Sequence, residues 1–233
     1  MANTPLLLLV TALPALTLSA SVNEGIINGR EAKPHSRPYM VSVQISKGHI
    51  CGGFLVSKSF VMTAAHCSEN AQNLKVVLGA HDLSAKDNLG PVTVKKYHRH
   101  PNFEPKTFMN DIMLLELENK VQLSKRVQLI PLPKPDGHVK AGTVCSVAGW
   151  GYTRPDGHPS MRLQEANLTV FNEAECKRLW TQHDGEGDSG GPLVCGDKAV
   201  GVSSFGQKCT NAALPEVYTN ISAFLPWINK IIG

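Results

Sequence analysis

The hexapeptide Gly187-Asp188-Ser189-Gly190-Gly191-Pro192 decides how the rest of the chain is interpreted. Its glycines permit a tight turn in which backbone N–H groups point into one concavity. Such a concavity can bind the negative charge that develops on a carbonyl oxygen during acyl transfer. The stretch therefore indicates a site where the hydroxyl of Ser189 attacks a carbonyl carbon.

Two further strings supply what a serine nucleophile lacks on its own. A serine hydroxyl reacts poorly near neutral pH unless a base lies within hydrogen-bonding distance and a third group orients that base. Thr63-Ala64-Ala65-His66-Cys67 offers a histidine, and Asn110-Asp111-Ile112-Met113-Leu114 offers an aspartate. Singly, the first is equally typical of a buried strand end and the second of a turn. Together they predict His66, Asp111 and Ser189 as a catalytic triad.

Length and composition favour a folded globular protein. The 233 residues are 42% hydrophobic and 18% charged, which is typical of a packed core and not of disorder. The formal net charge of +4 is mild, so it suits contact with acidic polymers but gives no reason to expect a nucleic-acid partner. We also expect a monomer.

An apolar segment near the N terminus predicts entry into the secretory pathway. Residues 6–18 are apolar, are too short to span a bilayer and are followed by small residues. We interpret residues 1–20 as a signal peptide, because the alternative, a buried N-terminal helix, is disfavoured by Pro5 and Pro14. No later segment has 18 consecutive apolar residues, so we expect a secreted or granule-stored protein without a membrane span.

Short apolar runs alternate with turn residues through the rest of the chain, which is typical of an all-β fold. A connector over residues 118–142 separates six expected strands from five, which predicts two antiparallel β-barrels of the six-stranded type, the second one strand short. A helix is expected over residues 173–180, and another at the C terminus where Phe224, Trp227, Ile228 and Ile231 have helical spacing. The expected strands are residues 40–46, 50–56, 60–65, 74–80, 92–100, 111–117, 144–150, 163–171, 191–196, 199–205 and 216–221.

Six cysteines follow the predicted signal peptide, and an even number in a secreted chain indicates disulfides. Spacing alone leaves their pairing open. None of the six lies at the Cys-x-x-Cys or Cys/His spacing of a zinc site. We therefore expect neither a metal ion nor a cofactor.

Further strings extend the pattern over nearly everything after residue 25. They are Ile26-Ile27-Asn28-Gly29-Arg30, Cys51-Gly52-Gly53-Phe54-Leu55-Val56, Val147-Ala148-Gly149-Trp150-Gly151 and Phe224-Leu225-Pro226-Trp227-Ile228. On these residues the chain resembles the chymotrypsin-like serine proteases, and within them the granule-stored group of granzymes, mast-cell chymases and cathepsin G. The resemblance implies a peptidase domain over residues 26–233, with halves of about 26–130 and 131–233, that acts on polypeptide substrates.

The resemblance also assigns catalytic roles. His66 would act as the general base, and Asp111 would hold its imidazole in the productive tautomer. The N–H groups of Gly187 and Ser189 would bind the oxyanion.

Activation of a zymogen is implied as well. Residues 21–25 would be a propeptide whose removal frees the α-amino group of Ile26 to pair with Asp188 beside the nucleophile. Signal cleavage after Ser21 would leave two dipeptides for a dipeptidase, whereas cleavage after Ala20 would leave five residues. The alternative is that Ile26 merely begins a strand.

By resemblance, one disulfide joins Cys51 to Cys67 and a second joins Cys145 to Cys195. Cys176 and Cys209 remain, and they either pair with each other or stay free. Only twelve residues separate Cys176 from Ser189, fewer than in the family by about a strand and its turn. Part of the loop beneath the specificity pocket is missing with that strand.

The remaining expectations concern binding and modification. By resemblance, Ser204, Phe205, Gly206 and Glu216 line the substrate site, and a carboxylate at Glu216 favours Lys or Arg, alongside aromatic side chains. The alternative is that Glu216 is a solvated residue at a strand edge. Sequons predict glycosylation at Asn167 and, in a more hindered position, at Asn220. An acidic proteoglycan could bind a patch of Lys95, Lys96 and Arg99, unless these simply form a solvated face.

Two functions compete at this point. The intact triad favours a secreted or granule-stored serine endopeptidase made as a zymogen. The shortened pocket keeps open a catalytically impaired homologue that binds glycans or microbial surfaces.

Overall fold

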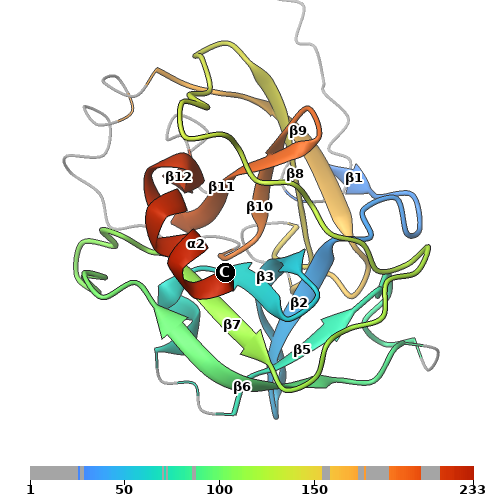
Figure 1. Cartoon of the computed structure of the whole chain (residues 1–233). Coiled ribbons are helices and arrows are strands. Elements are labelled where there is room, and N and C mark those ends of the chain that lie inside the picture. The colour runs from blue at the N-terminus through green and yellow to red at the C-terminus, as the bar shows by residue number, and fades with distance from the viewer. Residues whose placement is uncertain are drawn as a thin grey trace, which may run out of the picture.

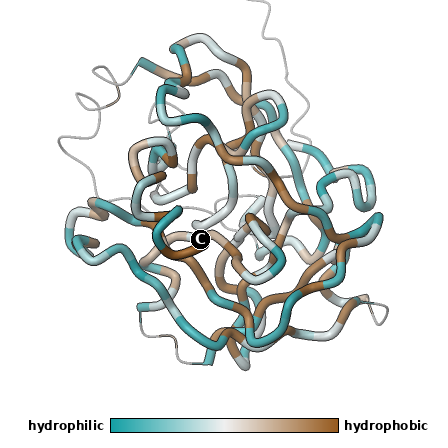
Figure 2. Tube along the Cα trace, in the orientation of Figure 1, coloured by the Kyte–Doolittle hydropathy of each residue, from teal (hydrophilic) through white to brown (hydrophobic). Residues whose placement is uncertain are grey.

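The computed structural model describes residues 26, 29–69, 71, 73–85, 88–153, 158–172, 176, 189–205 and 216–233. Two β-sheets lie side by side, and the C-terminal helix packs across one side of the molecule (Figure 1). Hydrophobic segments follow the strands, and hydrophilic segments concentrate in the outer loops (Figure 2). None of the described helices is long and apolar enough to cross a membrane.

The first sheet is a closed antiparallel barrel with the order β2-β3-β4-β7-β6-β5. All six strands were predicted, with small differences in their bounds. The third predicted segment, residues 60–65, ends early as strand β4, because its last residue begins a short 3-10 helix, η1 (Ala65–Ser68). The strands are β2 (Met40–Ile45), β3 (Gly48–Ser57), β4 (Phe60–Thr63), β5 (Lys75–Leu78), β6 (Val92–Arg99) and β7 (Met113–Leu117).

Strand β2 is buried on both of its faces and joins the two halves of the molecule. Val41 and Val43 pack into the core of the barrel. Met40 packs instead against a second cluster that includes Trp150 and Leu163. A strand with only one buried face would alternate apolar and polar residues, so this continuous burial places β2 between two packed layers.

The second sheet has six strands in the order β1-β9-β8-β10-β11-β12. Five of them follow the connector, as the sequence predicts. The sixth, β1, comes from the N-terminal segment and was not predicted, because two residues are too short for a recognisable period. Among the described strands, β1 and β12 form the edges of this sheet. The strands are β1 (Arg30–Glu31), β8 (Val144–Gly149), β9 (Gln164–Thr169), β10 (Pro192–Cys195), β11 (Lys198–Phe205) and β12 (Val217–Asn220).

The predicted C-terminal helix is confirmed as a short 3-10 turn, η2 (Ile221–Phe224), followed by α2 (Leu225–Ile232). Leu225 and Ile228 are buried, so the apolar side of the helix docks onto the barrel. The other predicted helix, residues 173–180, lies outside the described residues except for Cys176. With a barrel, a second six-stranded sheet and this helix, the structure confirms the predicted all-β fold class.

Disulfides join β3 to η1 through Cys51 and Cys67, and β8 to β10 through Cys145 and Cys195. These are the two pairs that the resemblance implied. Cys209 lies outside the described residues, so the pairing of the two remaining cysteines stays open.

Candidate active site

His66 and Asp111 form the best-defined polar pair of the candidate site. His66 lies on η1, and Asp111 lies two residues before β7. The Nδ1 atom of His66 is 2.7 Å from Asp111 Oδ2, and the backbone N–H of His66 donates to Oδ1 at 3.0 Å. The Asp111 side chain is 0% exposed. Because a carboxylate only accepts hydrogen bonds, Nδ1 carries the proton, and the neutral imidazole keeps a lone pair on Nε2.

A third donor reaches the same carboxylate from the other sheet. Ser204, on β11, is buried, and its Oγ donates to Asp111 Oδ2 at 2.6 Å. The sequence analysis placed Ser204 on the substrate-binding strand but did not anticipate this bond. With three donors around it, the buried Asp111 has the hydrogen-bond partners that a desolvated anion requires.

The backbone around Asp111 holds the carboxylate in place. Asn110 has a left-handed φ of 58°, which asparagine tolerates better than most residues, and its side chain donates to Asn102 O at 2.8 Å. On the other side, Thr219 Oγ1 of β12 donates to the Asp111 carbonyl at 2.9 Å. Both halves of the molecule therefore position Asp111.

Ser189 is anchored to the half that carries His66. Its carbonyl accepts a 2.9 Å hydrogen bond from the N–H of Gly52 on β3. The carbonyl of Gly52 in turn accepts from Thr63 Oγ1 at 2.7 Å. Because Gly52 follows Cys51, whose disulfide partner Cys67 is next to His66, both Ser189 and His66 are tied to the same short segment of β3.

Gly190 makes this close approach possible. Its φ of 86° lies in the left-handed region, and a β-carbon there would lie 2.5 Å from the Gly52 carbonyl oxygen. Only glycine fits both the conformation and the space. The predicted oxyanion donor Gly187 and the predicted ion-pair partner Asp188 lie outside the described residues.

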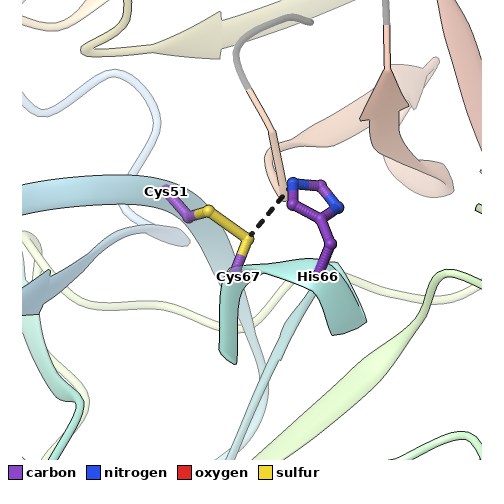
Figure 3. Close-up of side chains that lie close together, drawn as sticks. All are labelled: Cys51, His66 and Cys67. Atoms are coloured by element: carbon purple, nitrogen blue, oxygen red, sulfur yellow. Dashed lines mark hydrogen bonds between the residues drawn. A yellow bond between two sulfur atoms is a disulfide. The ribbon is translucent and has the colours of Figure 1, made fainter. Parts of the chain in front are cut away.

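The Cys51–Cys67 disulfide lies against the imidazole of His66 (Figure 3). The ring atom Nε2 is 3.9 Å from Cys67 Sγ. These three side chains are near enough together to resemble a metal site. However, a disulfide offers no thiolate, which is the form of cysteine that binds metal. We therefore interpret the disulfide as a brace for η1.

Glu216 lies immediately before β12 and is partly buried. It accepts a hydrogen bond from Ser203 Oγ at 3.0 Å and another from the hydroxyl of Tyr218. Burial raises the pKa of Glu216, although both hydrogen bonds oppose that shift. These bonds fix the carboxylate, so Glu216 is not a freely solvated residue. Phe205 ends β11, and Gly206 lies outside the described residues.

The predicted modification and patch residues lie on the surface. Asn167, on β9, is exposed, whereas the side chain of the exposed Asn220 caps η2 by accepting from Ser222 N at 3.2 Å. Lys95 forms a 3.1 Å ion pair with Glu116. Of the predicted basic patch, Lys96 and Arg99 are also exposed.

Comparisons with known proteins extend over almost the whole chain. A family model described as trypsin matches residues 26–228. The chain is 44% identical to granzyme H of Homo sapiens over 247 residues, which covers 97% of each protein. It is 42% identical to granzyme F of Mus musculus over 248 residues, again with 97% of each covered. A solved structure described as "Structure of GrC" matches with a TM-score of 0.80 and 38% identity, covering 88% of this chain and 98% of that one.

Proposed function

Because the chain belongs to the trypsin family of serine endopeptidases, we propose that it hydrolyses peptide bonds through Ser189, His66 and Asp111. The observation that carries this proposal is the 2.7 Å contact between His66 Nδ1 and the buried carboxylate of Asp111. It leaves Nε2 as the basic atom of the imidazole. A base oriented in this way is what a serine nucleophile requires.

The reaction follows from these positions. Ser189 Oγ attacks the peptide carbonyl carbon while His66 Nε2 takes its proton, and the same proton then passes to the leaving amine. In the second half-reaction, water attacks the acyl carbon while His66 Nε2 takes its proton, and the proton then passes to Ser189 Oγ as the acyl group is released. Asp111 stays ionised and stabilises the imidazolium that forms in each half-reaction. The N–H groups of Gly187 and Ser189 bind the oxyanion in this scheme, a contribution of about 3–4 kcal/mol per donor.

We further propose that the protein is made as a secreted zymogen. Residues 1–20 would direct secretion, residues 21–25 would be removed, and the new ammonium of Ile26 would pair with Asp188 in a monomeric domain of residues 26–233. The granzymes among its relatives support storage in secretory granules. Sequencing the N terminus of the mature protein tests this, and any start other than Ile26 argues against it.

The primary specificity is proposed to depend on Glu216. Its carboxylate is held by Ser203 and Tyr218 and would attract a Lys or Arg side chain of the substrate, with aromatic side chains also accepted. A peptide library cleaved by the wild type and by Glu216→Gln tests this. Basic residues at the cleaved position should be lost in the variant, and unchanged preference would exclude the role.

Two surface features are proposed as accessory. Asn167 is exposed on β9 and is the better candidate for glycosylation, because Asn220 uses its side chain to cap η2. Lys96 and Arg99 would give an acidic proteoglycan a weak binding patch, while Lys95 is engaged with Glu116. Salt-sensitive retention on heparin that is lost in Lys96→Ala/Arg99→Ala tests the patch.

A fluorophosphonate probe tests the enzymatic proposal directly. The processed protein beginning at Ile26 should be labelled, and Ser189→Ala should abolish the labelling. Unfolding by heat, followed by circular dichroism, identifies folded protein in both samples. Folded wild-type protein that is not labelled, or a labelled Ser189→Ala variant, would overturn the proposal.

A further inference from the structure

Three buried side-chain atoms in the described part of the chain lack a hydrogen-bond partner, and all three belong to the region around β1. They are His35 Nδ1, His81 Nδ1 and Gln164 Oε1. Nearly all buried polar atoms in proteins are partnered, so each exception requires an explanation. Two of these atoms are on neighbouring imidazole rings, whose centroids are 6.5 Å apart with an angle of 69° between the ring planes.

The tautomer of His81 follows from its contact with Glu31. His81 Nε2 is 2.9 Å from Glu31 Oε1. This hydrogen bond from His81 is the main cause that lowers the pKa of Glu31, and the nearby Arg162 acts in the same direction. An ionised carboxylate only accepts, so Nε2 carries the hydrogen. In the neutral imidazole, the buried Nδ1 therefore carries a lone pair that accepts no hydrogen bond.

His35 is held beside His81 by an unusual backbone conformation. Its φ is 58°, in the left-handed region that few non-glycine residues adopt. It belongs to the turn closed by the hydrogen bond from Ser36 N to Lys33 O, between β1 and β2. Strained residues of this kind persist where surrounding structure fixes them, often at ligand sites. The turn therefore places a second partly buried imidazole, whose Nδ1 atom is also buried, beside the first.

Gln164 is the third residue of this region with an unpaired buried atom. It lies directly opposite Glu31 in the β1–β9 ladder. Its Nε2 already donates to Ser160 Oγ at 3.2 Å and to Arg162 O at 3.0 Å, which leaves Oε1 as the unpaired atom. His81 Nδ1 and Gln164 Oε1 are therefore acceptors without a donor, and His35 Nδ1 is one as well when the hydrogen of its ring is on Nε2.

We propose that His35 and His81 bind one Zn²⁺ ion through their Nδ1 atoms. Imidazole nitrogen is a preferred ligand of zinc. A metal-bound histidine almost always donates its other ring N–H to a carboxylate or carbonyl, which is the arrangement of His81 with Glu31. Zn–N bonds of about 2.0–2.1 Å at a tetrahedral angle bring two imidazole centroids to roughly 5–6 Å. The two rings, whose centroids are 6.5 Å apart here, therefore have to move closer by about 1 Å to share the ion.

The position of this site gives it a consequence separate from proteolysis. His35 lies in the turn between β1 and β2, and His81 lies just after β5 of the barrel. Zn²⁺ bound to both would fasten the turn and the β1 strand that precedes it to the barrel (Figure 1). Zn²⁺ binding at these two histidines does not require Ser189, so a test of the metal site and a test of peptidase activity have independent outcomes.

Calorimetric titration of the folded protein with ZnCl₂ tests the site. One ion should bind per chain, and His35→Ala and His81→Ala should each abolish this binding. Glu31→Gln, which alters the carboxylate behind His81, should weaken it by about 10–100-fold. The matched control is His138→Ala, an exposed histidine of the connector, which should bind as the wild type does. Full binding in the double variant His35→Ala/His81→Ala would overturn the proposal.

A second measurement needs no variant and so cannot be confused by misfolding. Long-range ¹H–¹⁵N spectra of the wild type report which ring nitrogen of each histidine carries hydrogen. On addition of Zn²⁺, the Nδ1 signals of His35 and His81 should shift together while Nε2 of His81 keeps its hydrogen. Shifts confined to His66 or to other histidines, or no shift at all, would contradict the site.

Discussion

Ser204 Oγ lies 2.6 Å from Asp111 Oδ2, so a residue of the second sheet donates to the carboxylate that orients the histidine of the first half. Thr219 reinforces the same connection by donating to the Asp111 carbonyl. The two halves of the molecule therefore meet at one buried anion. A shift of β11 or β12 relative to the barrel should therefore move the Asp111 carboxylate and, with it, the imidazole of His66.

Replacing Ser204 with Ala should lower kcat for every substrate. The change removes one of three donors to a buried carboxylate, and a hydrogen bond to a charged group contributes about 1.5–3 kcal/mol. Steady-state kinetics with several peptide substrates measure the effect. Ser203→Ala is the matched control, because Ser203 donates to Glu216 instead and should change substrate preference. Equal kcat in Ser204→Ala and the wild type would show that the bond does not position His66.

Asp111→Asn should preserve the fold but nearly abolish turnover. The amide can donate toward His66 Nδ1, which favours the tautomer with hydrogen on Nε2 and removes the basic lone pair. A loss of about 10⁴-fold in kcat is expected for this change in a serine protease triad. Asp197→Asn, at an exposed aspartate 84% accessible to solvent, should leave kcat unchanged. Full turnover in Asp111→Asn would remove Asp111 from the mechanism.

Gly190→Ala should destabilise the protein and disable the site. The new β-carbon would press on the Gly52 carbonyl oxygen, and the left-handed φ of 86° adds strain. Gly196→Ala is a matched control: its φ is 63°, but nothing lies within 4 Å of the added carbon. The free energy of unfolding of the control should therefore fall only by the cost of the left-handed conformation, about 1–2 kcal/mol. Urea unfolding compares the two, and equal losses would mean that Gly190 is not tightly packed against β3.

Local patterns allowed the strands and the candidate triad to be predicted, whereas long-range contacts did not follow from the sequence. The barrel strands show apolar periods bounded by turns, and His66, Asp111 and Ser189 stand in recognisable strings. The bond between Ser204 and Asp111 spans 93 residues and has no local signature. For the same reason, the contact between the rings of His35 and His81, which are 46 positions apart, could not be predicted from local patterns. Strand β1 was not predicted, because the extended conformation of its two residues depends on their pairing with β9.

Lowering the pH should destabilise the protein through His49. This side chain is partly buried on β3, with Nδ1 2.8 Å from Ser42 Oγ and its ring 5.9 Å from that of Trp150. Burial lowers the pKa of His49 from 6.5 to about 4. Between these values the unfolded state binds more protons than the folded state, so the free energy of unfolding falls as pH decreases through this window.

The contribution of His49 is fully present above pH 6.5 and has been lost, by about 3 kcal/mol, when the pH reaches about 4. Urea unfolding at several pH values, for the wild type and His49→Gln, measures it as the difference between the two slopes. The variant lacks the titrating group, so its stability should fall less over this range, whereas His138→Gln, at an exposed site, should follow the wild type. Parallel curves for the wild type and His49→Gln would mean that the folded protein accommodates a charged His49, in contradiction to its burial.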